Sequence, residues 1–137
     1  MTEYYLKKEL REQVYAKPQR CTYCLSDYGI RKGKKIPLGF DHIIPISKGG
    51  LNEIENCVPC CFNCNASKNN FSLPEWFKSV KKKMNSTTDI DLKNRFTRIL
   101  TGISTLLEDT YVSEWTEKLV IIDKAQEKRA EQINSIL

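Results

Sequence analysis

The stretch from residue 41 to residue 68 decides the fold expected for this chain. It begins with Asp41-His42-Ile43-Ile44-Pro45, continues through Ser47-Lys48-Gly49-Gly50 and Asn56, and closes with Cys61-x-x-Cys64-Asn65-x-x-Lys68. It contains the only histidine of the chain, with an acid directly before it. Oxygen ligands beside a histidine suit metal-assisted hydrolysis of a phosphodiester, and the thiols suit a structural metal.

Length and composition indicate a small globular protein. The chain has 137 residues, of which 40% are hydrophobic and 28% charged. No stretch approaches the roughly 20 apolar residues that span a bilayer, and residues 1–5 lack the basic-then-apolar pattern of a secretory signal. We therefore expect a cytoplasmic protein with no membrane contact, in a compartment that keeps thiols reduced.

The positive charge is concentrated in the part of the chain that holds the motif. The formal net charge is +5. Residues 1–88 carry 15 of the 22 Lys and Arg residues but only 8 of the 17 Asp and Glu residues. An excess of positive charge on one part of a protein favours a polyanionic partner such as nucleic acid.

Six cysteines form three pairs with the same two-residue gap. The pairs are Cys21 and Cys24, Cys57 and Cys60, and Cys61 and Cys64. This gap suits tetrahedral metal ligation. A disulfide framework is the alternative, and a reducing compartment disfavours it. Spacing alone leaves open which two pairs share a metal.

The hydrophobic spacing predicts an α+β fold with helices at both ends and a small β-hairpin between them. The expected helices cover about 3–15, 62–69, 73–84, 89–108 and 111–136, the expected strands cover 39–44 and 57–58, and residues 27–35 are expected to form a basic connection. A capping box at Ser72-Leu73-Pro74-Glu75 predicts the start of the third helix. Because a polar linker follows it, we expect a core domain at 1–86 and a C-terminal helical hairpin at 87–137.

The chain resembles the HNH endonucleases over residues 21–68. The resemblance rests on five features together: the first cysteine pair, the Asp-His-Ile-Ile-Pro strand, the Ser-Lys-Gly-Gly loop, Asn56, and the closing Cys-x-x-Cys-Asn-x-x-Lys. It implies a ββα-metal core, in which a β-hairpin and a helix surround one divalent metal ion. It also implies zinc-binding knuckles beside that core.

The resemblance assigns roles to the polar residues of the motif. His42 would be the general base, since histidine can take up a proton near neutral pH. Asp41 and Asn65 would bind Mg²⁺ or Mn²⁺ through oxygen, with Asn69 as a reserve ligand. Asn56 would tie the loop down and help to orient His42.

The resemblance also assigns the structural metal. One Zn²⁺ would be held by Cys21, Cys24, Cys61 and Cys64, because Cys64 directly precedes Asn65 as it does in the family. Cys57 and Cys60 would then be small buried hydrophobic residues. Ligation by this third pair instead is the alternative.

Several lysines and arginines are candidate phosphate contacts, which position nucleic acid without reading its sequence. They are Arg31, Lys32, Lys34, Lys35, Lys48 and Lys68. A further lysine-rich helix face at 78–83 could equally be a solvated surface.

The sequence thus predicts a metal-dependent endonuclease that hydrolyses DNA, with double-stranded DNA as the expected partner. Two alternatives are open: a zinc-stapled nucleic-acid-binding module without cleavage activity, and a nuclease that acts on RNA. We also expect a homodimer through the C-terminal helices, because two nicked strands would then give a double-strand break.

Overall fold

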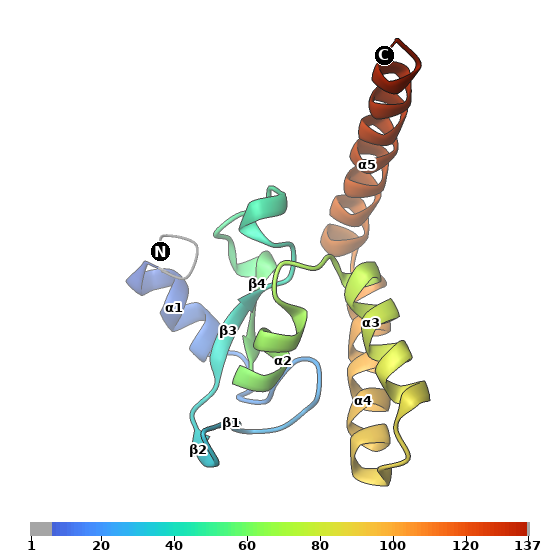
Figure 1. The fold of residues 1–137 in the computed structure, drawn as a ribbon. Coiled ribbons are helices and arrows are strands. Elements are labelled where there is room, and N and C mark those ends of the chain that lie inside the picture. Colours follow the sequence, from blue (N-terminus) through green and yellow to red (C-terminus); the bar gives the residue numbers. More distant parts are fainter. Residues whose placement is uncertain (1–6, 137) are drawn as a thin grey trace.

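The computed structural model describes residues 7–136 and confirms an α+β fold (Figure 1). The helices are α1 (Lys8–Tyr15), α2 (Phe62–Lys68), α3 (Leu73–Ser86), α4 (Ile90–Leu107) and α5 (Thr110–Ile136). The strands are β1 (Gly29–Arg31), β2 (Lys34–Ile36), β3 (Gly39–His42) and β4 (Cys57–Cys60). The predicted start of the first helix, at residues 3–6, lies outside the described residues.

Strands β3 and β4 and helix α2 form the centre of the molecule. The two strands pair antiparallel, with Asp41 opposite Val58 and His42 opposite Cys57. Helix α2 follows β4 almost directly and lies beside β3 (Figure 1). The end of β3 therefore faces a helix that carries its own polar side chains, which is the arrangement the motif predicted.

Strand β3 ends two residues earlier than predicted. The backbone of the next two residues turns to Asn56 instead of continuing the ladder: the Ile43 N–H donates to the Asn56 carbonyl at 2.9 Å, and the Ile44 N–H donates to Asn56 Oδ1 at 2.8 Å. Two 3₁₀ turns, η2 (Ile46–Lys48) and η3 (Ile54–Asn56), complete the loop.

The prediction of a connection without strands at 27–35 is wrong. Strands β1 and β2 form an antiparallel hairpin with a two-residue turn at Lys32 and Gly33, where φ is 51° and 76°. Such positive φ values define the tight hairpin turn that matches strand twist, and glycine adopts them without strain. The side chain of Asn63 fastens the hairpin to α2 by accepting from Ile30 N at 2.8 Å and donating to Ile30 O at 3.2 Å.

Helices α3, α4 and α5 begin as predicted, within one or two residues. The capping box of α3 is complete, since Ser72 Oγ accepts from Glu75 N and the Glu75 carboxylate accepts from Ser72 N. Asp89 caps α4 in a similar way, accepting from the N–H groups of Asp91 and Leu92. Side-chain caps of this kind satisfy N–H groups that lack a partner within the helix.

The C-terminal helices share the hydrophobic core of the motif. Ile99, Ile103 and Val112 belong to one buried cluster with Tyr23 and Trp76. The division into 1–86 and 87–137 stays a prediction, but residues from both sides of it pack together. No helix within residues 7–136 is both long and apolar enough to cross a membrane.

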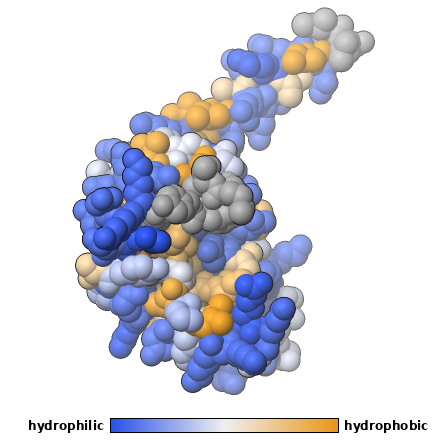
Figure 2. All heavy atoms as spheres, turned by 90° about the vertical axis from the view of Figure 1, so that its left-hand side faces the viewer, coloured by the Kyte–Doolittle hydropathy of each residue, from blue (hydrophilic) through white to orange (hydrophobic). Residues whose placement is uncertain are grey.

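The second half of α5 stands out from the rest of the molecule (Figures 1 and 2). Every residue from 120 to 135 is exposed. Among them are the large hydrophobic residues Val120, Ile121, Ile122 and Ile133, which lie near the two ends of a mainly hydrophilic segment.

Candidate functional site

A pocket of about 240 Å³ opens between β3 and α2. Three of the predicted catalytic residues line it together: Asp41, His42 and Asn65. The reserve ligand Asn69 lines it as well. The predicted residues therefore reach one cavity although they come from a strand and from a helix 20 residues further along.

His42 is held by a residue that we did not predict. Its Nε2 lies 2.6 Å from Oδ1 of Asn52, and its ring lies edge-on to Phe40 with centroids 5.6 Å apart. An amide oxygen can only accept a hydrogen bond, so this contact places the imidazole proton on Nε2. It leaves Nδ1 with a lone pair that can take a proton.

Asn56 holds the loop but not the histidine. It is fully buried, and its Nδ2 donates to the carbonyls of Ile44 and Leu51, both at 3.0 Å. Among the hydrogen bonds of the described residues, it makes none to the His42 side chain. At Gly50 a Cβ would clash with the Ile44 carbonyl, so this loop closes only with glycine at that position.

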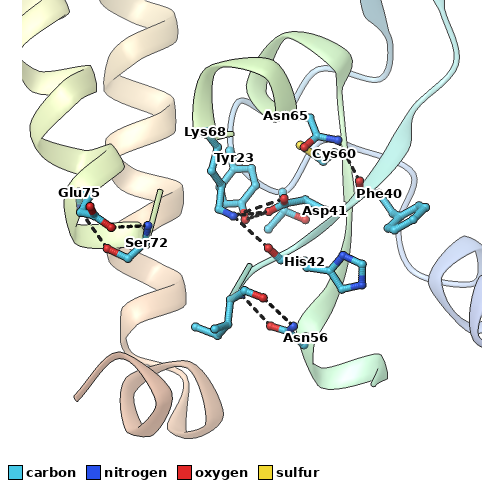
Figure 3. Close-up of polar contacts among 12 residues, drawn as sticks. Tyr23, Phe40, Asp41, His42, Asn56, Cys60, Asn65, Lys68, Ser72 and Glu75 are labelled. Carbon is cyan, nitrogen blue, oxygen red and sulfur yellow. Dashed lines mark hydrogen bonds and ion pairs between the residues drawn. The ribbon is translucent and has the colours of Figure 1, made fainter. Parts of the chain in front are cut away.

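Asp41, which lines the pocket, is surrounded by polar partners (Figure 3). The Tyr23 hydroxyl donates to its Oδ2 at 2.6 Å, and Lys68 Nζ lies 3.1 Å from Oδ2 and 3.3 Å from Oδ1. Burial, and next the charge of Asp41, raise the pKa of Tyr23 well above its usual value. The phenol therefore keeps its proton and acts as the donor.

Asn65 is oriented by the same strand. Its Nδ2 donates to the Phe40 carbonyl at 3.2 Å (Figure 3). The amide nitrogen therefore faces the strand, and Oδ1 takes no part in this hydrogen bond. An amide oxygen and a carboxylate are ligands that Mg²⁺ and Mn²⁺ accept. Asp41 and Asn65 thus fit a hard divalent cation at the pocket wall.

The four predicted zinc ligands form one buried cluster. The Sγ atoms of Cys21, Cys24, Cys61 and Cys64 all lie within 4.8 Å of one another. The Sγ atoms of Cys24 and Cys61 are 3.6 Å apart. A tetrahedral zinc site with Zn–S bonds of about 2.3 Å needs sulfur atoms about 3.8 Å apart, so the cluster fits Zn²⁺ with no position left open.

Helix α4 contacts the cysteine cluster directly. Arg95 Nη2 lies 3.5 Å from the Sγ of Cys64 and 4.0 Å from that of Cys61. Arg98 Nε donates to the Cys24 carbonyl at 3.0 Å. Four thiolates around one Zn²⁺ leave two negative charges, and a guanidinium beside them offsets part of that charge.

The third cysteine pair lies outside the cluster. Cys57 is buried against Val14 and neighbouring side chains of α1, and burial raises the pKa of its thiol to about 11. Cys60 is buried too, with its thiol 3.4 Å from the Cys61 carbonyl. Neither residue belongs to the group of four clustered sulfur atoms, so both fill space as small hydrophobic side chains.

One candidate phosphate contact has to be corrected. Lys68 is fully buried, and its ammonium group contacts Asp41 and, at 3.0 Å, the His42 carbonyl. Its position near the end of the helix suggested a lysine that could reach phosphate, but its ammonium group lies inside the core. Lys48 is accessible at the surface, where it pairs with Glu75 at 3.3 Å.

The other candidate phosphate contacts lie on the β1–β2 hairpin. Arg31, Lys32, Lys34 and Lys35 are all exposed. The Arg31 guanidinium lies over the ring of Phe62, 5.5 Å from its centroid, and Phe62 lines the pocket. The hairpin thus carries positive charge next to the candidate catalytic residues.

We expect Lys68→Met to destabilise the protein by about 3–5 kcal/mol, because removing one partner of a buried ion pair leaves the other charge uncompensated. Chemical denaturation followed by tryptophan fluorescence measures the loss. Lys83→Met, on an exposed lysine of α3, is the matched control and should change stability by less than about 0.5 kcal/mol. Equal effects of the two substitutions would show that the Asp41 pair does not stabilise the core.

These features define the ββα-metal class of protein: a β-hairpin and a helix enclose an acid, a histidine and an asparagine beside a four-cysteine cluster. The comparison with known families agrees, since the model of the HNH endonuclease family matches residues 21–71. Residues 21–71 therefore form an HNH endonuclease domain.

A relative supports the same family. The chain is 33% identical over 103 residues to YoqL of Bacillus subtilis (strain 168), whose name describes it as an HNH endonuclease derived from the SPbeta prophage. The match covers 72% of this chain but 41% of that protein. No solved structure shows a significant match.

Proposed function

We propose that the protein is a divalent-metal-dependent endonuclease that hydrolyses phosphodiester bonds of double-stranded DNA. The observation that carries the proposal is the single pocket shared by Asp41, His42 and Asn65. The basic β1–β2 hairpin beside that pocket supports a polyanionic substrate. Free cysteines throughout the described chain suit a reducing compartment, so the proposed location is the cytoplasm.

Each pocket residue has a separate part in the proposed reaction. His42 Nδ1 takes a proton from the water that attacks phosphorus, while Asn52 holds the ring by Nε2. Asp41 and Asn65 would hold the divalent cation, which when bound would stabilise the charge on the phosphate and on the leaving 3′ oxygen. The water oxygen bonds to phosphorus as the bond between phosphorus and O3′ breaks, and O3′ takes a proton from solvent water, which gives a 5′-phosphate and a 3′-hydroxyl.

A side-by-side substrate comparison tests the choice of DNA. Supercoiled plasmid, linear duplex DNA and structured RNA of similar length would be incubated with zinc-loaded protein and Mg²⁺ or Mn²⁺. We expect cleavage of both DNA substrates and little of RNA. Preferential cleavage of RNA would show that RNA, and not DNA, is the substrate. DNA binding without any cleavage would favour the zinc-stapled binding module instead.

Asn52→Ala should lower kcat about tenfold and leave KM nearly unchanged. Tenfold corresponds to about 1.4 kcal/mol, the upper end for one neutral hydrogen bond. Asn52→Asp keeps an acceptor at the same distance and should recover most of the rate, a result that a general loss of loop structure would not give. An alanine variant as fast as wild type would show that Asn52 does not orient His42.

We further propose that two copies associate through the projecting half of α5. Its exposed apolar residues, Ile122 and Ile133 among them, would be covered by the same residues of a second copy. Light scattering on the full chain should give the mass of two chains, and the double substitution Ile122→Asp and Ile133→Asp should give one. Gln132→Asp, at an exposed polar site on the same helix, is the control. A monomeric wild type at assay concentrations would contradict the dimer.

A further inference from the structure

Asp41 is the proposed metal ligand with the most constrained environment. It is 6% exposed, and one of its oxygens takes most of the contacts. Oδ2 accepts from the Tyr23 hydroxyl at 2.6 Å and pairs with Lys68 Nζ at 3.1 Å, whereas within residues 7–136 Oδ1 contacts only Lys68 Nζ, at 3.3 Å. A carboxylate offers about four lone-pair positions, so the anchored Oδ2 leaves Oδ1 available to a cation.

The Tyr23 backbone is part of the turn that carries the first two cysteines of the cluster. Tyr23 lies between Cys21 and Cys24, and the neighbouring Thr22 joins this turn to β4 through two hydrogen bonds to the Pro59 carbonyl, from its N–H and from its hydroxyl, both at 3.0 Å. The position of the phenol along the chain is therefore set by the zinc knuckle.

The Tyr23 side chain also has no room to move. Its ring is fully buried and meets Trp76 edge-on, with centroids 4.8 Å apart at 87°. Helix α4 closes over its backbone so tightly that a Cβ at Gly102 would lie 2.9 Å from the Tyr23 carbonyl oxygen. A hydroxyl carried by so rigid a ring can fix a carboxylate precisely in both distance and direction.

We propose that Tyr23 is a positioning residue that sets Asp41 for the catalytic cation and so links the zinc knuckle to the affinity of the catalytic metal site. The inference rests on the proposed function, because it takes Asp41 as a ligand of that cation. Groups that hydrogen-bond to a metal ligand typically change metal affinity 10–100-fold when they are removed. Tyr23 has this relation to Asp41, and the knuckle fixes the stretch of backbone that carries Tyr23.

Binding of Mn²⁺ to the zinc-loaded full chain tests the inference without any cleavage assay. Free Mn²⁺ would be measured by electron paramagnetic resonance for wild type, Tyr23→Phe, Asp41→Asn and the double variant. We expect Tyr23→Phe to weaken binding about tenfold or more, with bound zinc and the thermal unfolding midpoint close to those of wild type. In the Asp41→Asn background the same substitution should add nothing.

Tyr111→Phe is the matched control, because the Tyr111 hydroxyl is buried and has no hydrogen-bond partner among the described residues. It should leave Mn²⁺ affinity unchanged. If wild type binds Mn²⁺ in a way that depends on Asp41, but Tyr23→Phe binds it equally well, the inference falls and the proposed function stands. If Asp41→Asn binds Mn²⁺ as tightly as wild type, the metal assignment falls and the inference falls with it.

Discussion

His42→Ala should slow DNA cleavage by about 10²–10⁴-fold at saturating Mg²⁺. A positioned general base contributes this much to proton transfer, and histidine is the side chain that most often serves as one. The side chain is nearly buried and contacts Asn52 and Phe40. Its removal therefore takes away the base while the backbone pairing of β3 remains. Single-turnover cleavage of a labelled duplex measures the rate.

The loss must be separated from a loss of binding or folding. Zinc content, thermal unfolding and duplex affinity of His42→Ala should match those of wild type, since none of the cysteine ligands and none of the exposed basic residues is changed. Added imidazole should restore part of the rate if the cavity left by the ring admits it. A variant that cleaves as fast as wild type would show that another group takes the proton.

Removal of the zinc should abolish cleavage even when Mg²⁺ is abundant. The four cysteines hold together segments that are 37 or more residues apart in the chain, and Cys64 directly precedes Asn65. Small zinc-stapled units commonly lose their fold without the metal. Cys64→Ser should therefore lose bound zinc, lower the unfolding midpoint and leave no measurable activity.

Cys57→Ala is the matched control for this prediction. Cys57 is equally buried and lies seven residues away, but it is outside the cluster. It should keep one zinc ion per chain and most of the cleavage rate, with only a small loss of packing. A zinc-free Cys64→Ser protein that still cleaved DNA would separate the two metal sites, and loss of zinc in Cys57→Ala would assign the third pair a ligand role.

The central motif was predictable because its chemistry is local. A strand, a glycine loop and a helix with fixed gaps bring Asp41, His42 and Asn65 to one cavity, and each gap can be read from the sequence. The choice of Cys61 and Cys64 over the third pair agrees with the observed cluster. The long helices were predictable for the same reason, since their caps and apolar spacing lie within one segment.

The partners of the motif were not predictable, because they depend on packing between distant segments. Lys68 was expected at the surface, but only the position of Asp41, 27 residues away, makes its burial favourable. Asn52 and Tyr23 stand at positions with no spacing rule, and their roles appear when the loop and the knuckle close over β3. The β1–β2 hairpin was missed because its six strand residues show no clear alternation.

The conversion of supercoiled plasmid to nicked or linear DNA tests the central claim most directly: the pocket of Asp41, His42 and Asn65 is a metal-dependent phosphodiesterase site. Zinc-loaded wild type and His42→Ala would each be assayed with Mg²⁺ and with EDTA, within a time over which bound zinc is retained. We predict cleavage by wild type with Mg²⁺ and none in the other three reactions. Equal cleavage by His42→Ala, or cleavage by wild type in EDTA, would contradict the account.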